Sequence, residues 1–411
     1  MFLPVVLCDL DAAFLGFELL RRPELKGHPV IIGGRPEQRG VVATCSYEAR
    51  AFGVRSAMSA AEAVRRCPQA RLLPVDMPYY RELSSRFRQA ATRGMAVFEP
   101  VGLDEVYLDL RGQEKQYPDT EALCQDLQRR IREELGLACS VGASTGRALA
   151  KLACEILAKP GRIALLPAAA AAQVLAAQPV ERLPGVGAAT ATMLRRHGVF
   201  TCGDLGTASD DAVAHWFGAR GARVRDVARG IDHSAVIPPG PPKALSVDET
   251  FARDLSAPAD IRLALLRLSW LLGERLAAEG VSVREVGVRW RTPDFRDGSA
   301  QRTLSAPITA RTDLRDVALA VWAERGSSRP VRLLSIHAGR LERRRGCLLP
   351  QDRLEAAVAQ IEAAGQRLLP ASLLAWPRER AGRAEVAGEG LPRTPADGWP
   401  GSAGVHCRAE R

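Results

Sequence analysis

The chain has 411 residues, of which 46% are hydrophobic and 25% are charged, and its formal net charge is +10. This composition is typical of a globular protein, and the length indicates several domains because a single core rarely becomes so large. The charge favours a polyanionic partner such as nucleic acid, although a basic protein without such a partner is the alternative.

The nine cysteines include no Cys-x-x-Cys pair, and their irregular spacing argues against a disulfide framework or a cysteine metal site. We therefore expect reduced, mostly buried thiols in a cytoplasmic protein. The apolar run at 1–7 is too short for a signal peptide. No apolar stretch approaches the roughly 20 residues of a membrane span, so no membrane association is expected.

The first 166 residues alternate between strand and helix patterns. The segment LPVVLCDLDAAF (3–14) is apolar and then acidic, which predicts a strand that runs into a loop. Further strands are expected at 28–34, 40–50, 100–110 and 137–144, and helices at 59–68, 79–95, 120–135 and 147–157. The order strand, helix, strand, strand, helix, strand is that of a split βαβ sheet in an α+β protein.

Two further units and a tail follow. A helical unit is expected over 167–232, with two short helices flanking the sequence Gly-Val-Gly. The prolines of IPPGPPKALS (237–246) then predict a stiff linker at a domain boundary. Residues 243–346 combine period-two strand patterns with a long helix, so an α/β unit is expected there. From 347 we expect a helix and then a disordered tail, rich in Gly, Pro, Arg and Ala.

Adjacent carboxylates stand inside an apolar segment, PVGLDEVYLDL (100–110). Side chains alternate along a regular strand, so Asp104 or Glu105 would face the core unless the strand ends or bulges there. Asp9 ends the first predicted strand, and neighbouring strands would bring it next to Asp104. Three such carboxylates suit Mg²⁺. The alternative is that Asp104 is a turn residue and Glu105 pairs with a nearby arginine.

A second candidate pair lies within GVVATCSYEARAFGVRSAMS (40–59). Tyr47 and Arg50 are three residues apart, so one helical turn presents a hydroxyl and a guanidinium together. Arginine is suited to bidentate phosphate contact. The alternative is a surface arginine beside a packed tyrosine.

Five motifs in order carry a likeness to a known family. They are VVLCDLDAAF (5–14), VVATCSYEARAFGVRSAMS (41–59), FEPVGLDEVYLDL (98–110), LAKLACEILAKPG (149–161) and LPGVGAATATMLRRHGVFTCGDL (183–205). Together they resemble the Y-family translesion DNA polymerases, in particular the bacterial polymerase IV-like branch. The resemblance is strong over 1–232 and looser to about 345.

The resemblance implies a right-hand polymerase built from palm, fingers, thumb and a little finger domain. The corresponding ranges are 1–10 and 74–166 for the palm, 11–73 for the fingers, 167–232 for a thumb with a helix-hairpin-helix, 233–242 for the linker, and 243–346 for the α/β little finger. Residues 347–411 would form the C-terminal helix and tail.

The resemblance also implies roles for individual residues. The metal-binding and catalytic acids would be Asp9, Asp104 and Glu105, with a backbone carbonyl from Leu10, and they would hold two Mg²⁺ ions. Asp11 would be structural. Phe14 would be the steric gate that rejects ribonucleotides. The triphosphate of the incoming dNTP would be bound by Tyr47, Arg50 and Lys159.

Contacts to DNA are expected from two places. Gly185 and Gly187 would let backbone N–H groups approach a phosphate of the primer-template, although an ordinary αα turn is the alternative. In the third unit, Arg284, Arg289 and Arg291 are candidates for DNA backbone contact, although arginine on a solvated strand face is the alternative.

Some positions depart from the usual family pattern: Ala13 precedes the gate, Gly102 stands two before Asp104, and Gly146-Arg147 replaces a common Asn-Lys. The sequence contains no clear version of the short peptide motif that docks on a sliding clamp. The segment RRRGCLLPQD (343–352) offers leucines but no aromatic pair.

We therefore expect a monomeric, template-directed DNA polymerase that extends a primer 3′-OH by two-metal nucleotidyl transfer, in translesion synthesis and DNA repair. A non-catalytic polymerase-like repair scaffold is the main alternative, and a nucleotide cyclase or another palm-type phosphotransferase is a third.

Overall fold

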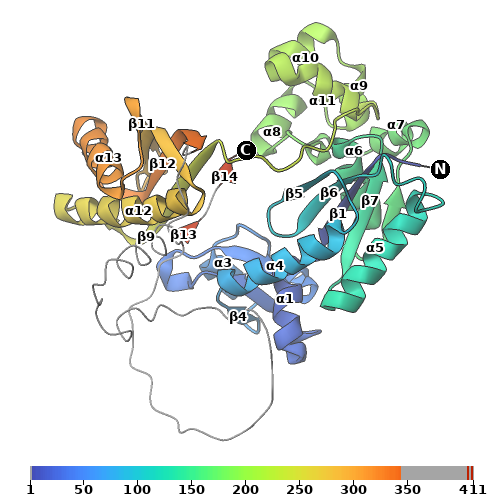
Figure 1. Ribbon diagram of the computed structural model, residues 1–411, viewed down its shortest axis with the longest axis horizontal. Helices are drawn as coiled ribbons and strands as arrows, with labels where there is room; N and C mark the ends of the chain where they lie inside the picture. The colour runs from blue at the N-terminus through green and yellow to red at the C-terminus, as the bar shows by residue number, and fades with distance from the viewer. Residues whose placement is uncertain (1, 344–404, 407–408, 411) are drawn as a thin grey trace, which may run out of the picture. The chain divides into compact units, whose positions relative to one another are not determined.

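The computed structural model describes residues 2–343, 405–406 and 409–410 (Figure 1), and the structural statements below concern these residues. The chain forms two compact units. The first comprises Met1–Pro36 and Val41–Gly240, and the second comprises Glu37–Gly40 and Pro241–Arg411. The division after Gly240 falls inside the proline-rich segment that the sequence marks as a linker. The expected helix after 347 and the leucines considered for clamp binding lie outside the described residues.

A five-stranded sheet is the centre of the first unit. Its order is β5 (Phe98–Val101), β6 (Glu105–Asp109), β1 (Val5–Leu10), β7 (Cys139–Ser144) and β8 (Ile163–Leu165). All neighbours are antiparallel except β7 and β8. Strand β6 thus lies between β1 and β5, which is the split arrangement that the order of elements predicts.

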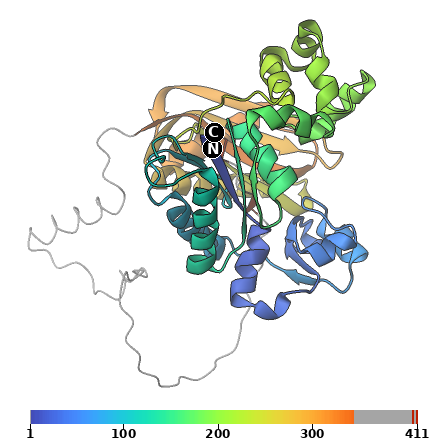
Figure 2. The ribbon, with the colours of Figure 1, turned by 90° about the vertical axis from the view of Figure 1, so that its right-hand side faces the viewer.

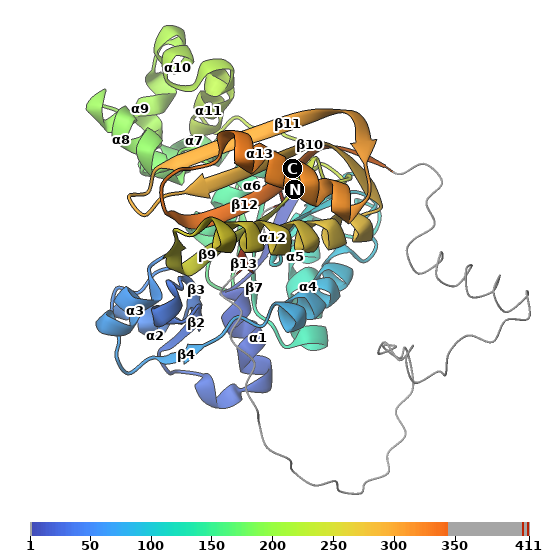
Figure 3. The ribbon, with the colours of Figure 1, turned by 90° about the vertical axis from the view of Figure 1, so that its left-hand side faces the viewer.

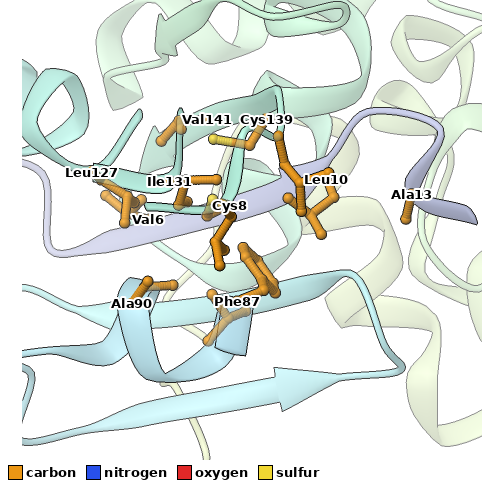
Figure 4. Packing of buried hydrophobic residues seen from close by; sticks show 14 of the residues in the cluster. Val6, Cys8, Leu10, Ala13, Phe87, Ala90, Leu127, Ile131, Cys139 and Val141 are labelled. Atoms are coloured by element: carbon orange, nitrogen blue, oxygen red, sulfur yellow. The ribbon is translucent and has the colours of Figure 1, made fainter. Parts of the chain in front are cut away.

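One face of this sheet is covered by α4 (Met77–Thr92) and α5 (Thr120–Leu135). Figure 4 shows Phe87 of α4 and Ile131 of α5 near Cys8 of β1, and all three are fully buried. Each helix begins at an aspartate cap, because Asp76 accepts from the Tyr79 amide at 3.3 Å and Asp119 from the Ala122 amide at 2.9 Å.

The opposite face is covered by α6 (Arg147–Leu152) and the π-helix η3 (Ala153–Ala158). Buried Ala150 and Cys154 from these turns pack on Val5, Leu7 and Tyr107 of the sheet. Because side chains alternate along a strand, Asp9 shares this second face with Val5 and Leu7. The predicted helix 147–157 is therefore present but changes from α to π geometry after Leu152.

The prediction of a single strand over 100–110 is wrong. The chain reverses at 102–104 between β5 and β6, and Gly102 has φ +62, a left-handed conformation that favours glycine. Asp104 lies in the turn, and Glu105 is the first residue of β6. The two acids are therefore at the end of a hairpin, where neither has to enter the core.

A small sheet follows β1 in the chain. It contains β2 (Val30–Gly33), β3 (Val42–Cys45) and β4 (Arg71–Leu73) in the order β3-β2-β4. The helices of this region are α1 (Ala13–Arg21), α2 (Tyr47–Ala51) and α3 (Ala60–Arg66). The predicted strand 40–50 is wrong in its second half, because Ser46 caps α2 through the Ala49 amide at 3.2 Å and ends the strand.

Helices alone build residues 168–228, which Figure 2 shows in green. They are α7 (Ala168–Ala176), α8 (Ala188–Arg196), α9 (Cys202–Thr207), α10 (Asp210–Phe217) and α11 (Gly221–Ala228). The expectation of two helices flanking Gly185-Val186-Gly187 needs correction. A 3₁₀ turn, Val180–Arg182, precedes the glycines, and only α8 follows them directly.

The second unit is an antiparallel sheet with two helices (Figure 3). Its strands β9 (Ala244–Leu255), β10 (Val281–Arg291), β11 (Asp297–Ile308) and β12 (Val331–Arg343) have the order β11-β10-β12-β9. Helices α12 (Pro258–Ala278) and α13 (Arg311–Arg325) share one buried core with the sheet.

Two short strands near the C-terminus, β13 (Val405–His406) and β14 (Ala409–Glu410), pair with the outer edge of β9. The tail predicted to be disordered therefore contributes pairing residues at its end. Over the described part of the chain, no helix combines the length and apolar character that crossing a membrane requires.

Candidate active site

Strand pairing brings the predicted acids to neighbouring backbone positions. In the β1–β6 register Asp9 lies directly opposite Glu105, and the Leu10 amide donates to the Asp104 carbonyl oxygen at 2.9 Å. Directly opposite residues of an antiparallel pair point to the same face of the sheet. Asp9 and Glu105 therefore share the face covered by α6, with Asp104 in the adjoining turn.

Two lysines contact these acids. Lys159 Nζ lies 2.7 Å from Asp9 Oδ2, and Lys151 Nζ lies 2.8 and 3.0 Å from the two carboxylate oxygens of Glu105. Sequence reasoning found Lys159 but missed Lys151. A signal was present, because the chain has only five lysines and two of them lie in the same short segment, LAKLACEILAKPG.

Asp9 and Asp104 are partly removed from solvent and lie close to other carboxylates. Burial raises the pKa of Asp9 to about 7, Lys159 opposes this shift, and the neighbouring charges of Glu105 and Asp104 add to it. Burial and the charge of Glu105 likewise raise the pKa of Asp104. Burial is the largest cause of both shifts, and like charge adds to it. Because Lys159 pairs with Asp9 and Lys151 pairs with Glu105, the charge of Asp104 is left without an ion-pair partner among the described residues.

The donor types fit a hard cation. Asp9, Asp104 and Glu105 supply carboxylate oxygens, the ligands that Mg²⁺ prefers, and Leu10 adds a main-chain carbonyl beside them. Within residues 2–343 and the four described C-terminal positions, however, no three His, Cys, Asp or Glu side chains are gathered closely enough to form a metal-binding group. Asp9 and Glu105 are instead each directed to a lysine.

Asp11 is hydrogen-bonded to strand β7 through one of its carboxylate oxygens. The Ser140 hydroxyl donates to Asp11 Oδ1 at 2.7 Å and accepts from the Gly161 amide at 2.9 Å. Gly161 follows Lys159 by two residues, so this relay ties the loop that carries Lys159 to strand β7. Sequence reasoning missed Ser140, since nothing in LACSVGAS distinguishes it from an ordinary strand serine.

Phe14 is the second residue of α1 and lies two positions after the left-handed residue Ala12 (φ +45). Its ring stacks on Tyr80 with centroids 4.5 Å apart and an interplanar angle of 29°. The ring is partly buried and packs at the edge of the core of the first unit. Tyr80 is a second residue that sequence reasoning did not single out.

Tyr47 and Arg50 are presented together on α2, as their spacing predicts. The Tyr47 side chain is 52% exposed, and the Arg50 guanidinium carbon lies 5.2 Å from the Tyr47 ring centroid. The Arg50 side chain also donates to the Cys45 carbonyl oxygen at 3.4 Å. The pair therefore offers a hydroxyl and a guanidinium on an accessible helix end.

The two predicted DNA-contacting glycines lie at an open surface. Gly185 has φ +91, which only glycine adopts readily, and a Cβ on either Gly185 or Gly187 would meet no atom within 4 Å. Gly187 is the N-cap of α8 and supplies no capping side chain. Both glycines are exposed, so the backbone of this turn faces solvent, although the Val186 amide between them donates to the Leu183 carbonyl oxygen at 3.0 Å.

The three predicted arginines of β10 differ in their surroundings. Arg291 makes two hydrogen bonds to Asp297, at 2.7 and 2.8 Å. Arg284 is paired with Glu342 and donates to the Ser305 carbonyl oxygen at 3.0 Å. The Arg289 side chain is exposed and makes no hydrogen bond or ion pair with any described side chain, so its charge is the most available of the three.

Comparison with known proteins gives two family matches. Residues 8–155 match the impB/mucB/samB family, and residues 242–348 match the C-terminal domain of that family. The two matches include every predicted acid and all three β10 arginines.

Individual relatives agree with these matches. A protein named DNA polymerase IV from Ralstonia nicotianae is 40% identical over 294 residues, which are 71% of this chain and 82% of the relative. A DNA polymerase IV from Halorhodospira halophila is 37% identical over 82% of this chain and 95% of the relative. A solved Y-family DNA polymerase chimera of Dbh and Dpo4 matches with a TM-score of 0.74 at 20% identity, over 83% of this chain and 99% of the chimera. At that identity the solved structure indicates a common fold.

Proposed function

The chain belongs to the Y family of DNA polymerases, and from that premise we propose how its residues carry out the reaction. The enzyme is a DNA-directed DNA polymerase of the translesion type, related to DNA polymerase IV. A primer 3′-OH attacks the α-phosphate of a deoxynucleotide, and pyrophosphate leaves. The observation that carries the assignment is the register in which Asp9 lies opposite Glu105, with Asp104 in the adjoining turn.

Asp9, Asp104 and Glu105, with the Leu10 carbonyl, would hold two Mg²⁺ ions, as donors of this type do. Bound Mg²⁺ would neutralise phosphate charge and lower the pKa of the primer hydroxyl. The arrangement of charges supports this assignment, since the three acids have only two lysine partners, on Asp9 and Glu105, and a site with one unpaired carboxylate favours a cation.

The basic residues of the site have separate tasks. Arg50 and Tyr47 bind the triphosphate from the exposed end of α2, where a guanidinium can contact two phosphate oxygens at once. Lys159 contributes a third contact to the triphosphate. When no nucleotide is bound, its ammonium group pairs with the Asp9 carboxylate. Lys151 holds the Glu105 carboxylate in one orientation. Phosphoryl transfer depends mainly on such positioning and charge neutralisation.

Phe14 acts as the steric gate against a ribose 2′-OH. Its ring is suited to this role because stacking on Tyr80 holds it in place.

The domains of the polymerase follow from the fold. The five-stranded sheet with α4 and α5 is the palm, the small sheet β3-β2-β4 belongs to the fingers, and α7–α11 form the thumb. The second unit is the little finger. The exposed backbone at Gly185 and Gly187 and the Arg289 guanidinium bind DNA phosphates without reading sequence.

The scaffold alternative has no observation in its favour, because all three acids are present and the relatives compared above are named as polymerases. The assignment is tested by primer extension with Mg²⁺ on an undamaged and a damaged template, comparing the native chain with Asp104→Ala. We expect extension by the native chain and none by the variant. A native chain that does not extend the primer, or a variant that extends it equally well, would refute the proposed centre.

A further inference from the structure

Glu18 is a carboxylate in the core of the first unit, with no exposed surface. It follows Phe14 by four residues on α1, so both side chains lie on the same side of that helix. A charged group is rarely buried without compensation, since dehydration strongly disfavours the charged form. The reaction proposed above makes no use of this carboxylate, so its retention in the core calls for another explanation.

Three neighbours balance the Glu18 charge. The Tyr80 hydroxyl donates to Glu18 Oε1 at 2.7 Å. Arg21 donates to both carboxylate oxygens, at 2.6 and 3.1 Å, and Arg22 Nη1 lies 3.6 Å from Oε2. Hydrogen bonds to charged groups are stronger than those between neutral groups. Glu18 therefore holds the Tyr80 hydroxyl more tightly than a neutral acceptor would.

Tyr80 connects this carboxylate to Phe14. Its ring is fully buried and stacks on the Phe14 ring, and it also contacts Phe17 with centroids 5.7 Å apart. With the hydroxyl fixed by Glu18 and the ring face against Phe14, Tyr80 cannot turn away without breaking a buried hydrogen bond. The contacts thus run in one line, from Glu18 through Tyr80 to Phe14.

The same network fixes α1 against α4. Arg21 Nη1 donates to Asp76 Oδ2 at 2.8 Å, and Asp76 is the N-cap of α4, the helix that carries Tyr80. Arg21 therefore joins the Glu18 carboxylate to the start of α4. Phe14 and Tyr80 lie on these two helices, so the position of each ring depends on the same set of ion pairs.

We propose that Glu18 is a positioning residue that determines sugar selectivity by fixing Tyr80 behind the Phe14 ring. The proposal rests on the gate role of Phe14 given above. The Phe14 ring rejects a 2′-OH only if it stays in one position. If Tyr80 were free to move, other rotamers of Phe14 would become available and the 2′-OH could be accommodated. Loss of the Glu18–Tyr80 contact therefore admits ribonucleotides.

A purely structural role for Glu18 predicts a different result. If it served only to join α1 to α4, its loss would lower extension with ribonucleotides and deoxynucleotides alike. The informative quantity is therefore the ratio of kcat/KM for a ribonucleotide to kcat/KM for the matching deoxynucleotide. General loss of folded enzyme leaves this ratio unchanged.

The experiment measures this ratio in the full chain for Glu18→Gln, Tyr80→Phe and Tyr80→Leu. Tyr80→Phe keeps the stacked ring and removes only the hydroxyl, so it tests the contact even where Glu18→Gln does not fold. The matched control is Tyr79→Phe, which removes the neighbouring hydroxyl, bonded to the Phe17 carbonyl oxygen at 3.1 Å. We expect the ratio to rise by about 10- to 150-fold in the three test variants, the range expected for one hydrogen bond to a charged group, and to stay unchanged in Tyr79→Phe.

A coupling measurement shows whether Glu18 acts through Phe14. In a Phe14→Ala background the gate is already absent, so Glu18→Gln and Tyr80→Phe should raise the ratio no further. Equal increases in both backgrounds would overturn the proposal, as would an unchanged ratio in Tyr80→Phe, because this variant removes only the hydroxyl that Glu18 binds. If Phe14→Ala itself leaves the ratio unchanged, the gate assignment fails and the Glu18 proposal fails with it. If Phe14→Ala raises the ratio but the Glu18 and Tyr80 variants do not, only the Glu18 proposal fails.

Discussion

Lys159 and Asp9 form an ion pair with Nζ and Oδ2 2.7 Å apart, although 150 residues separate them in the chain. Asp9 is almost completely buried, and Lys159 is partly exposed. Lys151 and Glu105 repeat the arrangement one strand away. The site thus carries two carboxylate–lysine pairs and one further carboxylate, Asp104, which forms no ion pair with a described residue. Asp104 is therefore the acid whose charge should be most needed for activity and least favourable for stability.

Asp104→Asn should abolish activity without weakening the fold. Burial and the charge of Glu105 raise the Asp104 pKa, so removing its charge relieves repulsion. We expect primer extension to fall by at least about 100-fold, and the free energy of unfolding to stay constant or rise by about 0.5–2 kcal/mol. Extension assays and urea denaturation measure the two quantities.

The matched control is Asp126→Asn on α5. Burial works against ionisation of Asp126, but hydrogen bonds from Arg130 and Tyr117 outweigh it and lower the pKa to about 2. This variant should lose stability and keep extension, the opposite of Asp104→Asn. A stability loss in Asp104→Asn as large as in the control would show that Asp104 is a structural residue.

Asp9→Asn should change how stability depends on pH in metal-free buffer. The Asp9 pKa is about 7 in the folded chain and near 3.8 when unfolded. Between these values the folded state binds more protons than the unfolded state, so the free energy of unfolding falls as pH rises. Asparagine does not titrate. Relative to the native chain, the variant should therefore gain stability between pH 5 and pH 8, measured by denaturation at each pH.

The control for this pH series is again Asp126→Asn. A folded pKa of about 2 means that its stabilising contribution is complete above the unfolded value and is lost only as pH falls toward 2. Its stability difference from the native chain should therefore be flat from pH 5 to pH 8. A flat difference for Asp9→Asn as well would contradict the raised pKa.

Ser140→Ala should loosen the loop that carries Lys159. The variant removes the donor to Asp11 and the acceptor of the Gly161 amide, and it leaves that amide without its partner. We expect the KM for deoxynucleotides to rise about 10-fold, as one hydrogen bond to a charged group implies, with a smaller change in kcat. Ser144→Ala, whose hydroxyl bonds the Leu166 carbonyl oxygen, is the control on the same strand. A larger loss in kcat than in nucleotide affinity would place Ser140 in the chemistry itself.

The sequence predicts the acids and their approximate meeting point because Asp9 ends one apolar strand pattern and the adjacent acids Asp104 and Glu105 interrupt another. It does not predict the register that sets Asp9 opposite Glu105, since that depends on the turn at Gly102 and on pairing across the whole sheet. Local patterns also predict the Tyr47–Arg50 pair, which depends only on helical spacing. The Glu18–Tyr80 contact joins residues 62 positions apart, and no local pattern indicates it.

Gly146 illustrates the same limit. It departs from the family pattern, and the sequence offers no reason for it. In the structure a Cβ at Gly146 would lie 2.4 Å from Asp232 Oδ2 and 2.7 Å from the Asp232 carbonyl oxygen. Asp232 accepts from the Ala148 and Leu149 amides, at 2.7 and 3.2 Å, and so caps α6 from the end of the helical region. Position 146 therefore has to be glycine, because Asp232, which is distant in the sequence, caps α6 and leaves no room for a Cβ there.

Asp232→Ala should therefore destabilise the first unit. It leaves two amides at the start of α6 without an acceptor, and loss of an N-cap costs about 0.5–2 kcal/mol. Because α6 carries Lys151, extension should also fall at temperatures near the unfolding midpoint. Asp232→Asn retains a side-chain oxygen and should recover most of the loss in thermal denaturation. Equal stability of the alanine and asparagine variants would contradict the capping role.

Deleting residues 376–411 should leave extension on a short primer-template largely intact, because every proposed site residue lies before 292.

The same deletion should, however, uncover the edge of β9 that β13 and β14 cover. An uncovered strand edge is a template for pairing with another chain. We therefore expect concentration-dependent self-association of the truncated protein, measured by light scattering. A deletion of 376–403 shortens the same segment but keeps both strands, and it should remain monomeric. Equal association of the two deletions would show that the terminal strands do not protect β9, and loss of extension in both would assign the segment a role in synthesis.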